Sequence, residues 1–473
     1  MSTPAQDASV VVGLGRSGCG AAKLLQSLGQ RVCLIESVDT PEAQARANTL
    51  RQLGIDVRLG VPLDSSSLSQ LDRQLEGGLH RLILSPGIRW DLPVLNELRS
   101  RGIRIHGELV PAWEASRPVP WIGITGTNGK TTVTHLVHHL LQASGLDAPM
   151  AGNVGVSAAE LVLERRSSTA GLPTWMVVEL SSYQIEAAPE VAPRIGIWTT
   201  LTPDHLERHG TLRAYRAIKR SLLERSMVQV LNGDDPDLRD HAASWPQACW
   251  VTAGPRQGLP GEIRPRLWVE AGRVMHDWHG TCQNLMAADC LAMPGEHNRQ
   301  NMMLSIAAGL EAGLSGEQME RAFRSFPGVP HRLERIHEHG GVTYYNDSKA
   351  TNYDAAEVAV RALAGPLVVL AGGQAKIGEA GGWLEALKQN ARAVVLYGAA
   401  QAEFQSLLEG AGFDGAIHLC GGLEEAVPRA RALALELHCR AVLLSPACAS
   451  FDQYADFEAR GEHFRSLVLT LAR

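Results

Sequence analysis

The chain has 473 residues, a formal net charge of −6, and 45% hydrophobic and 20% charged residues. This length suits about three domains of ordinary size, and the composition is that of a globular protein. Lysine and arginine form no block, the apolar runs are only as long as strands, and the polar N-terminus lacks a basic region. We therefore expect no nucleic-acid binding, no membrane insertion and no signal peptide. We expect a cytoplasmic protein and take it to be a monomer, although the pattern leaves the oligomeric state open. The eight cysteines lack C-x-x-C spacing, which indicates reduced thiols.

The first block, residues 1–112, alternates apolar strands with helical segments, which predicts parallel βαβ units. A strand over 9–12 leads into G-L-G-R-S-G at residues 13–18, and the next strand ends at Glu36. A glycine turn followed about twenty residues later by an acid fits the dinucleotide fingerprint, and alone it indicates a nicotinamide-dependent dehydrogenase. The same turn binds the phosphates of other nucleotides, or is only a tight structural turn, so three interpretations stay open.

The second block, residues 113–328, opens with I-G-I-T-G-T-N-G-K-T-T-V at residues 122–133. This pattern predicts a strand, a glycine-rich loop and a helix N-terminus, whose backbone N–H groups and dipole favour a phosphate. Lys130 would bring a positive charge to the β- and γ-phosphates, and Thr131 would place a hydroxyl on Mg²⁺. The match to the general P-loop pattern is imperfect, because Ile124 occupies its first glycine position. A chance Gly-Lys-Thr turn is the alternative.

Two strand ends in the second block carry candidate metal ligands. Glu179 follows the apolar strand 175–178, at the edge where ligands bind in doubly wound sheets, and a carboxylate there suits Mg²⁺. The alternative is an acid that caps the next helix. His205 and His209 have the i,i+4 spacing of a zinc pair, but no third ligand has the expected spacing and Gly210 interrupts the helix.

The remaining pattern completes an α/β fold of three domains. Residues 254–294 are rich in glycine and proline and predict a small antiparallel subsheet with a hairpin over 266–276, followed by a helix over 300–312. The third block, residues 329–473, again alternates strands and helices. We expect a Rossmann-like N-terminal domain, a central P-loop mononucleotide-binding domain with the antiparallel subsheet, and a Rossmann-like C-terminal domain.

Several strings together resemble motifs of the Mur ligases of peptidoglycan synthesis. They are T-G-T-N-G-K-T-T at residues 125–132, E-L-S-S-Y-Q at 179–184, T-P-D-H at 202–205, G-E-H-N-R-Q-N at 295–301, P-H-R at 330–332 and N-D-S-K-A-T-N at 346–352. The resemblance implies an ATP- and Mg²⁺-dependent ligase. It implies that ATP is bound by Gly126, Thr127, Asn128, Gly129, Lys130, Thr131, Thr132, Asn298, Asn301, Arg332 and Asp347. It implies that Mg²⁺ is bound by Thr131, Glu179, His205 and Lys219.

Lys219 shows how far the resemblance goes beyond the residues themselves. A lysine on a helix is ordinarily a solvated side chain, and the pattern alone predicts that here. The family implies instead that Lys219 is carbamylated by CO₂ and that the resulting carboxylate bridges toward Mg²⁺. The catalytic residues implied by the resemblance are Lys130, Lys219, His205 and Lys349.

Two C-terminal strings resemble the branch of the family that adds D-glutamate. They are G-G-Q-A-K at residues 372–376 and L-S-P-A-C-A-S-F-D-Q-Y at 444–454, whereas the Asp-Asn-Pro-Arg signature of the diaminopimelate-adding branch is absent. The implied reaction joins D-glutamate to UDP-N-acetylmuramoyl-L-alanine through an acyl phosphate, with L-glutamate or another amino acid as the alternative. The implied residues for these small-molecule substrates, with UDP on the first domain, are Gly15, Arg16, Ser17, Glu36, Ser37, Ser85, Asn153, Ser181, Thr351, Lys376, Ser450 and Phe457.

Three other classes of protein compete with this interpretation. The glycine turn at residues 13–18 suits a redox enzyme, but a second phosphate loop does not fit a simple dehydrogenase. A P-loop ATPase would hydrolyse ATP without an amino-acid acceptor. A non-catalytic protein that binds a UDP-sugar would have no use for the set of ATP and metal candidates.

Overall fold

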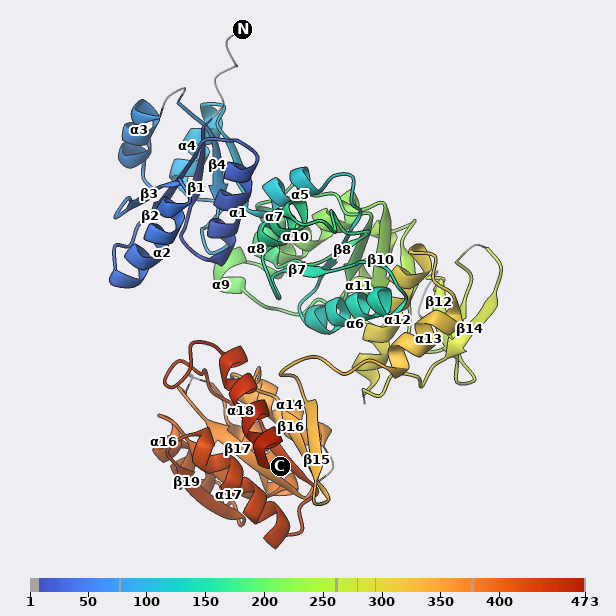
Figure 1. The fold of residues 1–473 in the computed structure, drawn as a ribbon. Helices are drawn as coiled ribbons and strands as arrows, with labels where there is room; N and C mark the ends of the chain where they lie inside the picture. Colours follow the sequence, from blue (N-terminus) through green and yellow to red (C-terminus); the bar gives the residue numbers. More distant parts are fainter. Residues whose placement is uncertain are drawn as a thin grey trace. The chain divides into compact units, whose positions relative to one another are not determined.

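A computed structural model describes residues 8–75, 78–259, 263–278, 280–293, 295–363, 365–375 and 378–471 (Figure 1). The chain divides into two compact units, one of Met1–Ala292 with Glu296–Phe326 and the other of Met293–Gly295 with Pro327–Arg473. The first unit holds two sheets and the second holds one. The predicted α/β class is confirmed. The domain boundary predicted after residue 112 lies inside the first unit and remains a prediction.

The first sheet is parallel throughout and has the strand order β3-β2-β1-β4-β5. The order reverses between β1 and β4, so the carboxyl ends of these strands form a switch point at which doubly wound sheets bind ligands. The strands are β1 Ala8–Val12, β2 Val32–Glu36, β3 Asp56–Leu59, β4 Leu79–Leu84 and β5 Arg104–Gly107. The helices are α1 Arg16–Ser27, α2 Pro41–Gln52, α3 Ser65–Gln74, α4 Pro93–Ser100 and α5 Leu109–Ser116.

Helix α1 begins at Arg16, inside the string G-L-G-R-S-G at residues 13–18. The glycine turn is therefore shorter than expected, and Gly18 already belongs to the helix. A Cβ atom at Gly18 would lie 2.1 Å from the carbonyl oxygen of Gly13, so only glycine allows the first turn of α1 to pack this closely on the end of β1.

The central sheet has nine strands in the order β14-β13-β12-β11-β10-β9-β6-β8-β7. They are β6 Trp121–Thr125, β7 Met150–Gly152, β8 Met176–Glu179, β9 Ile195–Trp198, β10 Val228–Asn232, β11 Cys249–Val251, β12 Leu267–Glu270, β13 Arg273–His276 and β14 Gln283–Ala287. The helices are α6 Lys130–Ala143, α7 Ala158–Ser167, α8 Ser182–Glu186, α9 Leu206–His209, α10 Leu212–Arg225, α11 Pro236–Asp240, α12 Glu296–Glu311 and α13 Gly316–Arg324, with 3₁₀ turns at Ala242–Ser244 and Arg256–Gly258.

The predicted hairpin joins β12 to β13, and its turn residues Ala271 and Gly272 both have positive φ, at 48° and 73°. Two positive φ angles are what the twist of a tight hairpin requires. The antiparallel strands continue the main sheet, because β12 pairs in parallel with β11 through Val251 and Leu267. Helix α12 starts at Glu296, four residues before the predicted start at residue 300, because its polar first turn carries no apolar periodicity.

The two sheets of the first unit share one hydrophobic core. Helix α1 packs against α7, with Leu24 and Leu161 among the buried residues of that core. Gly20 allows the approach, because a Cβ atom there would lie 2.5 Å from Ser157 Oγ. At the edge of the contact, Arg16 Nη1 donates to the carbonyl oxygen of Gly155 at 3.0 Å.

The sheet of the second unit has the order β15-β16-β20-β17-β18-β19, with only β15 antiparallel to its neighbour. Its strands are β15 Glu334–His339, β16 Val342–Asn346, β17 Leu367–Gly372, β18 Ala391–Tyr397, β19 Ala416–Cys420 and β20 Ala441–Leu444. Its helices are α14 Tyr353–Ala362, α15 Gly381–Asn390, α16 Gln401–Gly410, α17 Leu423–Glu436 and α18 Phe457–Leu471. Separate hydrophobic clusters cover its two faces, as a parallel sheet with helices on both sides requires.

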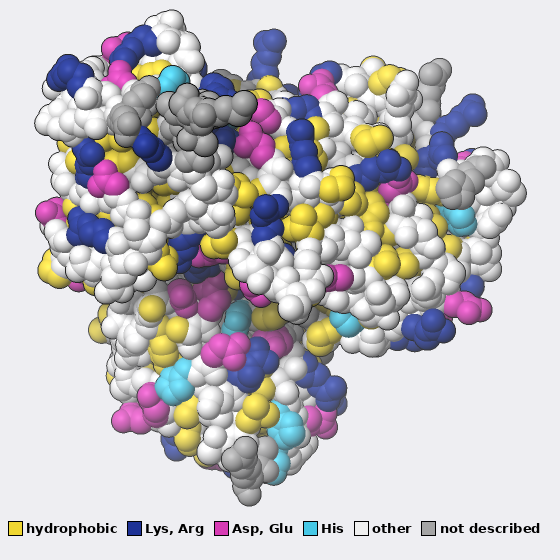
Figure 2. All heavy atoms as spheres, turned by 45° about the horizontal axis from the view of Figure 1, so that its top comes forward, with side chains coloured by type: hydrophobic (Ala, Val, Ile, Leu, Met, Phe, Trp, Pro, Cys, Tyr) yellow, Lys and Arg dark blue, Asp and Glu magenta, His cyan; other side chains and the backbone are white. Residues whose placement is uncertain are grey.

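The face drawn in Figure 2 is not predominantly basic. On the side drawn in Figure 2, lysine and arginine side chains are interspersed with aspartate and glutamate. In the described ranges, no helix is both long and apolar enough to cross a bilayer.

Candidate active site

The loop between β6 and α6 has the backbone of a phosphate site. Gly126 and Gly129 have positive φ, at 150° and 81°. A Cβ atom at Gly126 would lie 1.9 Å from Thr199 Oγ1, so the loop can run this close to the end of β9 only with glycine. Gly129 is the N-cap of α6 and gives no side-chain hydrogen bond to the helix. The first N–H groups of α6 are thus left for an anion, which the helix dipole also favours.

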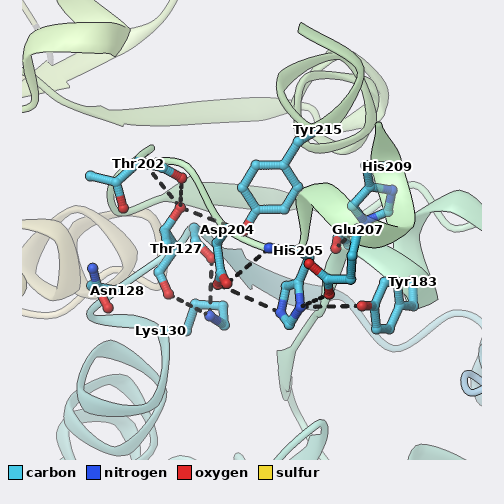
Figure 3. A network of polar contacts seen from close by, with 12 residues as sticks. Thr127, Asn128, Lys130, Tyr183, Thr202, Asp204, His205, Glu207, His209 and Tyr215 are labelled. Carbon is cyan, nitrogen blue, oxygen red and sulfur yellow. Dashed lines mark hydrogen bonds and ion pairs between the residues drawn. The ribbon is translucent and has the colours of Figure 1, made fainter. Parts of the chain in front are cut away.

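The loop is held in place by the segment that follows β9. The N–H of Thr127 donates to the carbonyl of Thr200 at 2.8 Å, and the N–H of Asn128 donates to Thr200 Oγ1 at 2.9 Å. Thr127 Oγ1 donates to the carbonyl of Thr202 at 3.1 Å and accepts from its N–H at the same distance (Figure 3). Such bracing means that little reorganisation is needed before a phosphate binds.

Glu179, the last residue of β8, has a free carboxylate oxygen that fits a hard cation. The side chain is 2% exposed, and its Oε1 accepts from Asn153 Nδ2 at 2.9 Å. Its Oε2 is buried and has no hydrogen-bond partner among the described residues. A buried carboxylate oxygen without a donor is costly unless a cation binds it. The residues present thus fit Mg²⁺, which takes one or two carboxylates together with phosphate oxygens and water.

Zinc does not fit the two histidines. Nowhere in the described part of the chain do three or more His, Cys, Asp or Glu side chains form a group that could hold a metal ion. His205 lies in the left-handed region, with φ of 52°, and its N–H donates to Asp204 Oδ1 at 2.9 Å. Its Nδ1 lies 3.2 Å from the hydroxyl of Tyr183 (Figure 3). Its half-exposed ring could supply one ligand to a metal ion, but the neighbouring residues do not complete a zinc site.

Lys219 is buried, so the pattern-based expectation of a solvated lysine is wrong. The side chain is 1% exposed, and its Nζ donates to Thr125 Oγ1 at 3.2 Å and to the carbonyl of Gly126 at 2.9 Å. Lys130 Nζ donates to the same Gly126 carbonyl, at 3.0 Å. Burial, and then the charge of Lys130, hold the pKa of Lys219 well below its ordinary value, against weaker opposite effects of nearby acids. This environment favours the neutral amine.

Two asparagines of α12 lie against the phosphate loop. Asn298 and Asn301 are one turn apart and each is 7% exposed, and Asn301 Nδ2 lies 3.4 Å from Asn298 Oδ1. A Cβ atom at Gly129 would lie 2.7 Å from Asn301 Oδ1. The motif at residues 295–301 is more than 150 residues from the phosphate loop in sequence, and the structure brings the two together within the first unit.

The switch point of the first sheet carries a second candidate site. Glu36 accepts the N–H of Leu14 at 2.9 Å and that of Val38 at 3.2 Å. Burial raises the pKa of Glu36, but these hydrogen bonds outweigh it and lower the pKa overall. Beside it is a pocket of about 250 Å³. Its lining comprises Leu14, Gly15, Glu36, Val38, Thr40, Glu42, Ala43 and Arg46. An ionised carboxylate here can accept hydrogen bonds from a ligand.

Ser85 lies next to the glycine turn of this site. A Cβ atom at Gly13 would lie 2.5 Å from Ser85 Oγ. The hydroxyl is buried and has no partner among the described residues. Arg16 and Ser17 begin α1 on the other side of the turn, and Ser37 donates to Glu36 Oε1 at 3.1 Å. These positions agree with a site for a nucleotide bearing a diphosphate.

In the second unit, Asp347 lies at the end of β16 in a buried polar setting. Its carboxylate accepts the N–H of Leu333 at 3.1 Å and the hydroxyl of Ser445 at 3.1 Å. Burial raises the pKa of Asp347 to about 7, and the nearby charge of Arg332 lowers it less strongly. Thr351 follows this segment, just before α14.

Other predicted residues of the second unit are also brought together, with one exception. Lys349 Nζ lies over the ring of Phe457, 5.3 Å from its centroid. Ser450 is 2% exposed and begins a turn in which its carbonyl accepts the N–H of Tyr454 at 2.8 Å. Lys376 lies outside the described residues.

Arg460 organises this part of the second unit and has no signal in the sequence. It is fully buried on α18, and its guanidinium donates to the carbonyls of Ser348 at 2.8 Å and Cys448 at 3.1 Å. It also donates to Ala449 and to the Ser348 hydroxyl. An arginine in a C-terminal helix ordinarily suggests an exposed position, so only the fold reveals that it joins two of the motifs.

Comparison of the sequence with known proteins identifies one family. A family model for the Mur ligase middle domain matches residues 124–309, and one for the Mur ligase glutamate ligase domain matches residues 331–448. A protein of Prochlorococcus marinus (strain MIT 9313) named UDP-N-acetylmuramoylalanine–D-glutamate ligase is 55% identical, over 97% of this chain and 98% of its own. A protein of the same name from Synechocystis sp. is 44% identical, over 98% and 99%.

Solved structures show the same fold. The UDP-N-acetylmuramate-alanine ligase MurC of Thermotoga maritima is similar over 99% of this chain and 100% of its own, with a TM-score of 0.56 and 18% identity. A pseudomurein peptide ligase type C from Methanothermus fervidus covers 98% and 100%, with a TM-score of 0.52 and 19% identity. With relatives of more than half identity along almost its whole length, the chain belongs to the Mur ligase family.

Proposed function

We propose that this protein is an ATP-dependent ligase that joins D-glutamate to UDP-N-acetylmuramoyl-L-alanine in cytoplasmic peptidoglycan precursor synthesis. The observation that carries the proposal is that Lys219, Glu179 and the phosphate loop lie together at the carboxyl ends of the neighbouring strands β6 and β8. Full-length relatives at 43–55% identity named for this reaction support the choice of substrates.

In the proposed reaction, an oxygen of the alanine carboxylate attacks the γ-phosphorus of ATP, and the bond to ADP breaks. The glutamate amine then attacks the acyl carbon and loses a proton, and the C–O bond to phosphate breaks as the amide forms. Lys130 and the N–H groups at the start of α6 stabilise the negative charge that develops on the phosphoryl oxygens. The protein mainly positions and neutralises its substrates.

Mg²⁺ would be held by Glu179, the hydroxyl of Thr131, His205 and a carboxylate on Lys219. When bound, the ion neutralises charge on the phosphates. The orphaned Oε2 of Glu179 supports this assignment. Asn153 donates to Oε1 of Glu179, which leaves Oε2 available for the ion.

Lys219 is proposed to carry a carbamate. Its neutral nitrogen attacks the carbon of CO₂, an N–C bond forms as one C–O π bond breaks, and a proton leaves the nitrogen, so a buried neutral amine becomes an anion. The low pKa of Lys219 makes the reactive neutral amine available, and the negative charge of the product would be attracted to Lys130. The Thr125 hydroxyl, which accepts from Nζ, donates its proton to the carbonyl of Leu180 at 2.9 Å and so fixes the position of the amine.

The other roles are assigned by domain. Residues 1–112 would bind UDP through Glu36, Ser37, Ser85 and the glycine turn, with Asn153 and Ser181 of residues 113–328 toward the sugar-linked alanine. Asn298 and Asn301 would bind ATP together with Arg332 and Asp347. Within residues 329–473, Lys349 and Thr351 would contact the reacting carboxylates, and Lys376, Ser450 and Phe457 would bind glutamate.

Phosphate release by the purified chain tests the proposal. ATP and UDP-N-acetylmuramoyl-L-alanine are supplied with D-glutamate, L-glutamate or diaminopimelate in separate reactions. The proposal predicts release that requires the UDP substrate and D-glutamate. Release without any acceptor would indicate an ATPase, and release with L-glutamate alone would assign the opposite stereochemistry.

A further inference from the structure

His209, which the sequence offers as half of a zinc pair, lies in an aromatic cluster. Its ring stacks on Tyr215 with centroids 5.5 Å apart and planes at 28°, and it lies 5.3 Å from the ring of Tyr183 (Figure 3). Its Nε2 is 2.9 Å from Ser182 Oγ. His209 does not form a metal site, but its ring contacts a tyrosine ring on each side.

The two tyrosines come from the helix that follows Glu179 and from the helix that carries Lys219. Tyr183 is on α8, four residues after Glu179. Tyr215 is on α10, one turn before Lys219, whose Nζ lies 4.6 Å from the centroid of the tyrosine ring. The hydroxyl of Tyr215 is 3.4 Å from Thr127 Oγ1 of the phosphate loop. His209 contacts both tyrosines and so connects the two elements.

Helix α9, which carries His209, is too short to be stable without contacts to other elements. It is a single turn with no buried residue, it begins after His205 in the left-handed region, and it ends at Gly210 with φ of 75°. A turn this short is unstable in isolation, so side-chain contacts must fix it. Besides His209, the anchor is Arg208, whose guanidinium lies 2.7 Å from Glu186.

We propose that His209 is a positioning residue of the ligase reaction, whose ring packs on Tyr183 and Tyr215 and thereby fixes α9 and His205 relative to Glu179 and Lys219. The role in catalysis rests on the proposed function, whereas the role in ordering α9 does not. The residue acts through its neighbours and needs no contact with a substrate.

Two substitutions separate the ring from its hydrogen bond. His209→Gln keeps a polar group within reach of Ser182 but removes the ring, and His209→Phe keeps the ring but removes the hydrogen bond. We expect His209→Gln to lower kcat by about ten- to a hundredfold, with the KM for ATP little changed, because small displacements of reacting groups reduce the rate strongly. His209→Phe should stay within about threefold of the wild type.

Amide hydrogen exchange of residues 205–210 in the unliganded protein gives a readout independent of activity. Exchange should be about tenfold faster in His209→Gln and unchanged in His209→Phe, since only the former frees α9. The matched control is His339→Phe in the second unit, where His339 stacks on His337 with centroids 6.4 Å apart. That control should change neither kcat nor the exchange of residues 205–210.

Equal losses in both His209 variants, or no change in either kcat or exchange in His209→Gln, would overturn the inference. A wild-type chain that fails to ligate would refute the proposed function alone, because the exchange arm would still report on α9.

Discussion

Glu108, which immediately precedes α5, is a buried acid whose ionisation should limit the stability of the protein above neutral pH. Its side chain is 3% exposed, and Oε1 accepts from Gln184 Nε2 at 3.0 Å. Oε2 is buried without a partner in the described part of the chain. Burial raises the pKa of Glu108 from its ordinary value of 4.5 to about 7, against a smaller lowering by the Gln184 hydrogen bond. The folded state therefore holds this proton more tightly than the unfolded state.

The sign and size of the effect follow from that pKa. The stabilising protonation is fully present below pH 4.5 and is lost as pH rises through about 7, because the unfolded chain releases the proton first. One pKa unit corresponds to about 1.4 kcal/mol, so the loss amounts to about 3 kcal/mol as an order of magnitude. Glu108→Gln cannot ionise and should escape this loss. Any penalty for its buried amide, about 1–3 kcal/mol, is independent of pH.

The assay is denaturant unfolding of wild type and Glu108→Gln at about pH 5 and about pH 8, followed by tryptophan fluorescence. The difference in unfolding free energy between the two proteins should move by about 3 kcal/mol in favour of the variant as pH rises. Glu164→Gln, which neutralises an exposed acid on α7, is the matched control. A difference between wild type and Glu108→Gln that does not change with pH would refute the reasoning.

Three further predictions concern the site itself. Lys130→Ala should lower the ligation rate by about 10²–10³, because a preorganised charged donor is lost, and a wild-type rate in steady-state kinetics would contradict this. Lys219→Ala should be almost inactive and partly restored by small carboxylic acids, whereas a high-resolution density map of the active protein with an unmodified Lys219 amine would exclude the carbamate. Calorimetry should show binding of UDP and not of NAD, and tight NAD binding without UDP binding would return the first sheet to a redox role.

Features encoded in adjacent residues could be predicted from the sequence. The apolar run before Gly126 predicts β6, and the strand-like pattern over 266–276 predicts the hairpin, because each depends only on local sterics and alternation. Strand ends could likewise be located, as at Glu179. These local signals were enough to identify the fold class and the phosphate loop.

Features that depend on contacts between distant segments could not be predicted from the residues alone. Lys219 is buried only because its amine reaches the carbonyl of Gly126, 93 residues away, and Arg460 reaches Ser348 across 112 residues. The same lysine or arginine on a free helix would be solvated. The spacing of His205 and His209 indicated no role for His209, whose partners are aromatic rings supplied by other helices.

The central claim is that the alanine carboxylate is phosphorylated before glutamate attacks. Its most direct test is mass spectrometry of the products formed from ATP, D-glutamate and UDP-N-acetylmuramoyl-L-alanine labelled with ¹⁸O in the alanine carboxylate. The proposed mechanism predicts a nucleotide product that has gained a glutamate residue, and inorganic phosphate that carries a single ¹⁸O from the labelled carboxylate. Unlabelled phosphate, released without the glutamate adduct, would contradict it.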